Sequence, residues 1–181
     1  EHQSAMIFTA TKLKGAFVID IVKNEDERGF FSRSWCVNEM KEFGLNQNIC
    51  QTNISFNKTK GTLRGMHFQV APYQEAKYVR CTRGGIYDVI IDLRKNSPTF
   101  KQWIGVELTA ENYRMLYVPE DFAHGFITLE DNTEISYLMT EFYVPGAGAT
   151  IRWNDPLFKI EWPLQPVLMS EKDRNQSNFY L

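Results

Sequence analysis

The feature that most constrains the fold is a succession of short segments, rich in β-branched and aromatic residues, that turn-forming residues separate. Gly, Pro, Asn and Asp stand between them, for example at 84–85, 96–98 and 131–132. Strands of about five to eight residues at this spacing are typical of a β-sandwich or barrel. The expected strands cover residues 16–22, 30–35, 51–56, 62–69, 78–82, 86–93, 103–108, 114–118, 125–129 and 134–139.

Helical patterns are scarce in this chain. Val37, Met40 and Phe43 lie about one turn apart, and Gly44 follows where a C-terminal cap belongs, which predicts one short helix over 37–43. No alternation of strand and helix patterns runs along the chain, which argues against a Rossmann-type sheet. The residues therefore predict an all-β fold. Aromatic residues make up 14% of the chain, and either a well-filled core or a ring-lined pocket for a flat ligand explains them.

Length and charge narrow the class of protein. The chain has 181 residues of even composition and a formal net charge of −2, so we expect one domain over 6–181 and no nucleic-acid partner. No apolar run approaches the roughly 18 residues of a membrane span, so no membrane partner is expected. Residues 1–5, before Met6, are predicted to be a remnant of an expression tag.

Three cysteines, Cys36, Cys50 and Cys81, are sparse and odd in number. Such a set fits reduced thiols in the cytoplasm better than a disulfide framework. Each is expected within or beside a strand, where a buried and inert thiol is the usual state. The sequence thus predicts a cytoplasmic protein without a reactive cysteine.

The few histidines limit the chemistry that is open to the chain. His2 lies in the predicted remnant, so only His67 and His124 remain, and no His-x-His or Cys-x-x-Cys pair is present. A metal-dependent jelly roll usually needs two or three histidines and a carboxylate. A Gly-x-Ser-x-Gly elbow and a Walker-type loop are also absent. Acid–base chemistry without a metal or cofactor is the class that remains.

His67 lies in a segment with strand character. A small residue, Gly65, would leave space beside it for a ligand, whereas a core histidine bonded to a backbone carbonyl is the structural alternative. Period-two alternation assigns the segment to two faces, with Leu63, Gly65, His67 and Gln69 on one and Arg64, Met66 and Phe68 on the other.

Four further polar residues stand out. His124 follows a turn and enters a strand, and Tyr137 lies in mid-strand, where its phenol needs a partner and is able to donate a proton. Taken singly, both are more often structural than catalytic. Lys77 and Arg80 flank the start of a strand, and their simplest interpretation is that of solvated charges at its rim.

Seven collinear blocks give the chain a specific resemblance. They lie at 28–31 (RGFF), 63–69 (LRGMHFQ), 77–81, 88–94, 119–126, 153–156 and 170–173. Together they closely resemble the dTDP-4-dehydrorhamnose 3,5-epimerase family, over residues 17–173. The resemblance implies a double-stranded β-helix (cupin) jelly roll with a few short peripheral helices. It also implies a homodimer with N-terminal strand exchange that epimerises a nucleoside-diphosphate 4-keto-6-deoxy sugar without a metal.

The resemblance also implies the residues of the site. The base falls on His67, its orienting carboxylate on Asp173, the general acid on Tyr137 and the enolate-stabilising cation on Lys77. Such a set suits removal of a proton next to a ketone and its return on the opposite face. Guanidinium forks match phosphate oxygens, which suits a diphosphate. The implied substrate contacts are Arg28, Phe31, Gln51, Asn53, Arg64, His124, Tyr143 and Lys172.

Two departures from the family pattern bear on the substrate. Arg33 and Gly148 stand where the family usually has a glutamate, and both glutamates contact the nucleotide-sugar side of the site. We therefore hypothesise that the reaction type is kept while the sugar, the nucleotide or the number of epimerised carbons differs. A third departure bears on the carry-over of Asp173, because the spacing from Trp162 to Asp173 is one residue shorter than usual.

Two alternatives stay open from the sequence. A single-carbon epimerase at C3 or C5, or a ketoisomerase, would use the same base on another nucleotide sugar. A non-catalytic jelly roll would only bind the nucleotide sugar, but it would have no use for an acid and a base on opposed faces.

Overall fold

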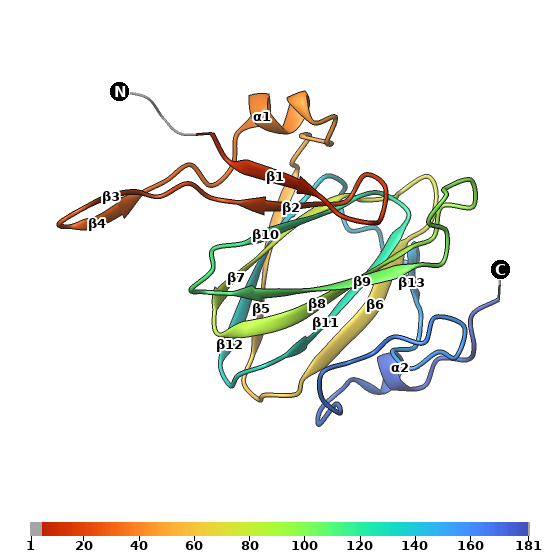
Figure 1. Ribbon diagram of the computed structural model, residues 1–181. Coiled ribbons are helices and arrows are strands. Elements are labelled where there is room, and N and C mark those ends of the chain that lie inside the picture. Colours follow the sequence, from red (N-terminus) through yellow and green to blue (C-terminus); the bar gives the residue numbers. More distant parts are fainter. Residues whose placement is uncertain (1–4, 181) are drawn as a thin grey trace.

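The computed structural model describes residues 5–180, so the expectation for residues 1–4 of the predicted remnant lies outside the described residues. Two antiparallel sheets face each other as a sandwich (Figure 1). The first has the strand order β1-β2-β10-β7-β12-β5 and the second β13-β6-β11-β8-β9. The first comprises β1 (Ile7–Ala10), β2 (Phe17–Asp20), β10 (Met115–Val118), β7 (Lys77–Arg83), β12 (Thr133–Met139) and β5 (Gln51–Asn57). The second comprises β13 (Gly148–Thr150), β6 (Leu63–Gln69), β11 (Phe122–Thr128), β8 (Gly85–Asp92) and β9 (Trp103–Thr109).

Alternating side chains of both sheets fill the space between them. Val79 and Ile135 from the first sheet meet Ile90 and Phe126 from the second in one buried cluster. Successive residues of a strand point to opposite faces, so every second residue of these strands enters the interior. The expected all-β jelly roll is confirmed, and nearly all predicted strands are present within about two or three residues of their expected ends.

The outer faces of both sheets are also covered. Helix α1 (Val37–Glu42) places Met40 against Ile19 and Tyr78 on the outside of the first sheet. The C-terminal segment, with the short helix α2 (Glu171–Arg174), covers the second sheet, where Phe158 packs near Met66. The predicted helix is confirmed and ends before Gly44, which has a φ of 71°. The sequence did not indicate α2, β1, β3 or β13.

A two-stranded hairpin projects from the sandwich at the N-terminal side (Figure 1). It consists of β3 (Asn24–Asp26) and β4 (Gly29–Phe31), and its side chains are exposed. The turn signal at residues 26–29 forms its tip, where Gly29 takes a φ of 137°. The expected strand over 30–35 therefore shrinks to the second arm of this hairpin.

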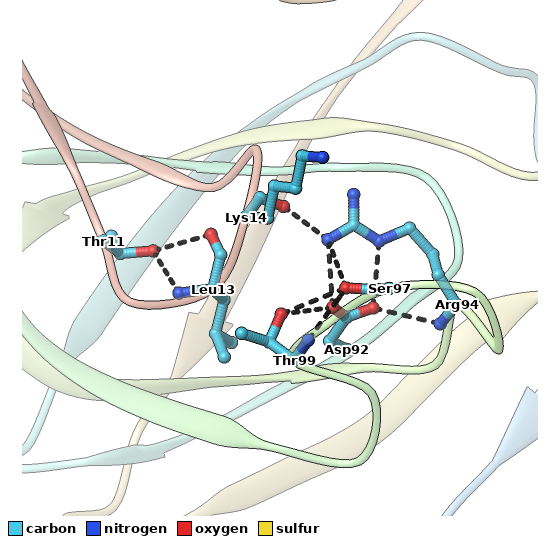
Figure 2. A network of polar contacts seen from close by, with 7 residues as sticks. All are labelled: Thr11, Leu13, Lys14, Asp92, Arg94, Ser97 and Thr99. Carbon is cyan, nitrogen blue, oxygen red and sulfur yellow. Dashed lines mark hydrogen bonds and ion pairs between the residues drawn. The ribbon is translucent and has the colours of Figure 1, made fainter.

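A buried carboxylate ties the β8–β9 connection to the β1–β2 loop (Figure 2). Asp92 is fully buried and accepts hydrogen bonds from Arg94, from the Ser97 hydroxyl at 2.5 Å and from the Thr99 hydroxyl at 2.7 Å. Arg94 also donates to the carbonyl of Lys14. Burial acts to raise the pKa of Asp92, but these hydrogen bonds outweigh it and hold the pKa below its ordinary value.

Candidate active site

A cavity of about 680 Å³ opens between the two sheets. Strands β5, β7 and β12 supply one wall, β6, β11 and β13 supply the other, and α2 contributes at the rim. Every second side chain of a strand points inward. Each wall combines strands that are far apart in the sequence, so it carries residues from several distant parts of the chain. The polar lining includes Gln51, Asn53, Ser55, Arg64, His67, Glu75, Lys77, His124, Tyr137, Tyr143 and Lys172.

A β-bulge in β6 brings Arg64 and His67 to the same cavity. In the pairing of β11 with β6, His124 is opposite His67, but Phe126 is opposite Arg64, so β6 has one extra residue. The bulge reverses the alternation, and both Arg64 and His67 line the cavity while Met66 enters the outer cluster. The predicted division of residues 63–69 into two faces therefore holds for Met66, His67 and Gln69 but is wrong for Leu63 and Arg64, because it assumed an unbroken strand.

Two glycines allow this local geometry. Gly65 has a φ of 121°, and a Cβ there would lie 2.5 Å from the Cα of Gly125. A Cβ on Gly125 would in turn lie 2.6 Å from the Met66 sulfur. The two strands thus approach closely beside the two histidines that line the cavity, and only residues without a side chain fit there.

His67 forms a dyad with a carboxylate from the C-terminal helix. Its Nε2 lies 2.7 Å from Asp173 Oδ1, and the Gly65 N–H donates to Asp173 Oδ2 at 3.1 Å. The Ser170 hydroxyl caps α2 by accepting from the Asp173 N–H, which fixes the helix end. Burial opposes ionisation of Asp173, but the contact with His67 and the other hydrogen bonds hold its pKa below the ordinary value. The shorter spacing before Asp173 does not displace it from His67.

The dyad fixes the role of each ring nitrogen of His67. A carboxylate selects the tautomer in which Nε2 carries the proton and donates to it. Nδ1 is then left with a free lone pair. The His67 side chain is 47% exposed, so the ring is accessible to a ligand in the cavity. This is the arrangement of an oriented general base.

A second dyad joins His124, which lines the same cavity, to Asp88 behind it. His124 Nε2 is 2.6 Å from Asp88 Oδ1, and both side chains are buried. Burial lowers the pKa of His124, and Asp88 only partly opposes this effect. We therefore expect a neutral imidazole that binds a ligand without bringing a positive charge.

Lys77 supplies a cation at the cavity wall. Its side chain is 9% exposed, and its ammonium lies 3.4 Å from Glu75. The interpretation of Lys77 and Arg80 as solvated rim charges is wrong. Lys77 is the first residue of β7 and points inward, while Arg80 lies on the outer face and is partly buried, so that burial lowers its pKa.

Tyr137 lies on the wall opposite His67. It belongs to β12 of the first sheet, whereas His67 belongs to β6 of the second, and both line the one cavity. Burial raises the pKa of the Tyr137 phenol, while a hydrogen bond with Ser55 acts to lower it. A phenol with a raised pKa stays protonated at neutral pH and is available as a proton donor.

The remaining predicted contacts divide into two groups. Gln51, Asn53, Tyr143 and Lys172 lie around the cavity, and Gln51 Oε1 accepts the Tyr143 N–H at 2.8 Å. Tyr143 is itself 70% exposed at the rim.

Arg28 and Phe31 form the second group, and they are not brought to this cavity. Both lie on the projecting β3–β4 hairpin, where Arg28 pairs with Asp26 at 2.5 Å and Phe31 is 69% exposed. Arg33 also lies away from the cavity, and it pairs with Glu39 of α1 at 2.8 Å.

Several polar residues of the site were missed in the sequence. Ser55 shares the inward parity of Gln51 and Asn53 along β5, so alternation could have found it. Asp88 and Glu75 gave no comparable signal, because their importance lies in contacts with His124 and Lys77 across the fold.

The cysteines differ from expectation. Cys81 is buried in β7, and burial raises its pKa to about 11. Cys36 is partly buried just before α1, and Cys50 is exposed, so the prediction of buried thiols holds for Cys81 alone. Within residues 5–180, no group of three or more metal-binding side chains is present. In the same range, neither helix has the length and apolar character that crossing a bilayer requires.

The fold and the cavity define a cupin-type jelly roll whose interior holds an oriented imidazole opposite a protonated phenol. The model of the dTDP-4-dehydrorhamnose 3,5-epimerase family matches residues 10–180. The chain belongs to this family, as its sequence blocks predicted.

Individual relatives agree with this assignment. A dTDP-4-dehydrorhamnose 3,5-epimerase of Shigella flexneri is 46% identical over 155 residues, which cover 85% of each chain. The crystal structure of such an epimerase from Bacillus anthracis with TDP and PPi bound has a TM-score of 0.92 at 39% identity, covering 97% of this chain and 100% of that one. ChmJ, a 3'-monoepimerase from Streptomyces bikiniensis in complex with dTDP-quinovose, has a TM-score of 0.84 at 30% identity, covering 93% and 85%.

Proposed function

We propose that this chain epimerises a dTDP-linked 4-keto-6-deoxy sugar at the carbons next to its ketone. The observation that carries the proposal is the position of the His67–Asp173 dyad and Tyr137 on opposite walls of one cavity. Inversion requires that a proton leaves one face of a carbon and another arrives on the opposite face. A base and an acid that face each other across the substrate meet this requirement.

In the proposed reaction, Nδ1 of His67 removes the proton from the carbon next to the ketone. The C–H electron pair forms the enolate double bond, and the carbonyl π electrons move to the oxygen. Asp173 stabilises the imidazolium that results, and the ammonium of Lys77 stabilises the enolate oxygen. Neutral His124 lines the same region and contributes a polar contact without competing for the proton.

Tyr137 completes the inversion in this proposal. Its hydroxyl gives a proton to the opposite face of the same carbon, and the enolate collapses to the ketone. The phenolate then regains a proton from solvent, and the His67 imidazolium releases the substrate proton to solvent, so the enzyme returns to its starting state. These transfers are complete with groups of the chain and solvent water, and the proposal includes no metal and no cofactor.

The nucleotide part is proposed to bind nearer the rim. Arg64 offers a guanidinium for the diphosphate, and Gln51, Asn53, Tyr143 and Lys172 surround the opening. Gly148 lines the same cavity, and a Cβ there would meet nothing within 4 Å. The missing family glutamate at Gly148 thus leaves an open position, which supports our hypothesis of a changed sugar or nucleotide specificity.

We further propose a homodimer in which the N-terminal region is exchanged. The β3–β4 hairpin carries Arg28 and Phe31 away from their own cavity and leaves Phe31 exposed. A second copy would bring these residues to the partner's cavity and so complete the predicted set. We also propose that residues 6–181 act as one domain in the cytoplasm, where its free thiols stay reduced.

The reaction is tested by solvent exchange. The protein is incubated with dTDP-4-keto-6-deoxyglucose in D2O, and the sugar proton signals are followed by NMR. Loss of both the C3 and the C5 proton is expected for a double epimerase. Loss at one carbon would replace it by the single-carbon alternative, and the absence of any exchange would refute the proposed reaction in favour of a binding protein. His67→Ala is expected to reduce exchange at least about 100-fold with an unchanged near-UV circular dichroism spectrum.

The exchanged hairpin is tested by complementation. Arg28→Glu and His67→Ala chains are each expected to be nearly inactive, because each lacks one part of the site. Co-expressed chains would form mixed dimers in which one site is intact, so about a quarter of the wild-type activity should return. No recovery in mixed dimers would contradict an exchanged hairpin without touching the acid–base proposal.

A further inference from the structure

Two residues outside the proposed acid–base set connect Tyr137 to Arg64. Ser55 and Asn57 lie on β5 and point to the same face as Tyr137 on the neighbouring strand β12, with Ser55 opposite Ile135 and Asn57 opposite Thr133. Asn57 is 2% exposed, and its amide nitrogen lies 3.3 Å from Ser55 Oγ. The Nε of Arg64 donates to the other end of the same amide, Asn57 Oδ1, at 2.7 Å.

The donors and acceptors of these side chains determine which group donates in each hydrogen bond of the series. A guanidinium has only donors, so the Asn57 group that faces Arg64 must be the amide oxygen. The NH2 group of Asn57 must then face Ser55, and it also donates to the Thr133 carbonyl at 3.3 Å. Ser55 Oγ therefore accepts from Asn57, and the single proton of its hydroxyl remains available for another acceptor.

The Tyr137 phenol is placed to be that acceptor. The register places Ser55 opposite Ile135, one diagonal step from Tyr137 on the same face, and both residues line the cavity. Interaction with the Ser55 side chain also acts to lower the pKa of the phenol, as expected for neighbouring hydroxyls. When Ser55 donates to the phenol oxygen, the proton of Tyr137 is left to point into the cavity. After that proton is transferred, the phenolate is only an acceptor, so Ser55 must donate to it.

We infer that Ser55 and Asn57 are positioning residues that form a relay from the Arg64 guanidinium to the Tyr137 phenol. The relay orients the phenol proton toward the substrate and stabilises the phenolate that proton donation leaves. Each hydrogen bond in the chain polarises the next one, so the positive charge of Arg64 is felt at the phenol oxygen. This inference rests on the proposed epimerase function, and it adds that binding of the diphosphate by Arg64 and readiness of the acid are linked.

The relay predicts that inversion and exchange respond differently to substitution. His67 removes and returns a proton on its own face, so exchange of substrate hydrogen with D2O does not need Tyr137. Ser55→Ala should lower the rate of inversion by about 10- to 100-fold relative to exchange, the usual effect of losing a hydrogen bond to a charged group. A merely structural role of Ser55 would lower both rates by the same factor.

Asn57→Asp is a second variant, which keeps the Ser55 hydroxyl but removes the NH2 group that donates to it. The aspartate still accepts from Arg64, but it has no NH2 group to donate to Ser55. The Ser55 hydroxyl would then donate to the aspartate and turn away from Tyr137. We expect the same fall in the ratio of inversion to exchange as in Ser55→Ala, and no further fall in the double variant. Ser55→Thr keeps the hydroxyl and should keep the ratio, and Ser136→Ala, on the outer face of β12, is the matched control.

A measurement without sugar separates this inference from the proposed function. In protein labelled with 13C at tyrosine Cζ, the Tyr137 resonance is assigned by its loss in Tyr137→Phe. It should shift in Ser55→Ala and Asn57→Asp and stay in place in Ser136→Ala. An unmoved resonance, or an unchanged ratio of inversion to exchange in Ser55→Ala, would overturn the relay. An absence of exchange in the wild type together with the expected shifts would refute the proposed reaction and leave the hydrogen-bonded relay standing.

Discussion

Asp173→Asn tests the orientation of the proposed base. In the structure the carboxylate is an acceptor twice, from His67 Nε2 at 2.7 Å and from the Gly65 N–H at 3.1 Å. The amide that replaces it has an oxygen on one side and an NH2 group on the other. It therefore cannot accept from both groups, and the variant must adopt one of two arrangements.

Each arrangement impairs the base for a different reason. If the amide oxygen faces Gly65, the NH2 group faces His67 Nε2, which must then carry the lone pair. The ring proton moves to Nδ1, and the nitrogen that faces the cavity is no longer a base. If the amide is reversed, its NH2 group meets the Gly65 N–H, and a buried donor loses its partner at a cost of about 1–3 kcal/mol.

These costs bound the expected loss. Each 1.36 kcal/mol changes an equilibrium tenfold. The cost of the reversed arrangement alone therefore reduces the fraction of enzyme in which His67 Nδ1 can act as a base by about 5- to 150-fold. The variant also lacks the negative charge that stabilises the imidazolium, and the corresponding substitution in the serine-protease triad lowers kcat about 10⁴-fold. We expect kcat to fall by about 10²- to 10⁴-fold, with little change in KM because Asp173 is not among the residues that line the cavity.

The assay is deuterium exchange and product formation at saturating nucleotide sugar. Asp155→Asn is the matched control, since Asp155 is 2% exposed and also accepts two backbone N–H groups, from Leu157 and Phe179, outside the cavity. It should lose stability without losing kcat. An Asp173→Asn variant that keeps its fold and retains kcat within fivefold of the wild type would refute the assignment of Nδ1 as the proton acceptor.

Three further predictions concern the acid, the close strands and the buried carboxylate. Tyr137→Phe should abolish inversion while His67-dependent exchange persists, and NMR in D2O separates the two; equal loss of both would contradict its role as the acid. Gly125→Ala should cost about 1–3 kcal/mol in urea unfolding, since its Cβ would lie 2.7 Å from the Arg64 carbonyl oxygen, and unchanged stability would show that the strands separate freely. The lowered pKa of Asp92 means that the unfolded chain binds more protons near pH 4, so this contribution to stability is present above that pH and is lost as pH falls through the lower native pKa. Asp92→Asn should therefore flatten the acid side of the stability profile in urea titrations, and an identical slope in both proteins would be inconsistent with this linkage.

Local patterns in the sequence determined the architecture to a large extent. A strand alternates its side chains with a period of two, and turns need Gly, Pro, Asn or Asp, so both signals are written in neighbouring residues. For this reason most strands of the sandwich, though not β1 and β13, could be predicted, together with the short helix α1 and the tip of the β3–β4 hairpin. The collinear blocks also indicated the family and the candidate base and acid.

The tertiary structure decided the contacts that make these residues a site. The bulge in β6 arises from its pairing with β11, and it turned Arg64 to the face of His67 against the local alternation. His67 and Asp173 are separated by 106 positions, so only the docking of α2 on the second sheet brings them within 2.7 Å. The tertiary structure also decided the position of the hairpin residues Arg28 and Phe31, because the β3–β4 hairpin projects from the sandwich and carries them away from the cavity. Alternation is a property of one strand, whereas register, docking and burial depend on the partner that each strand meets, and no stretch of sequence contains that information by itself.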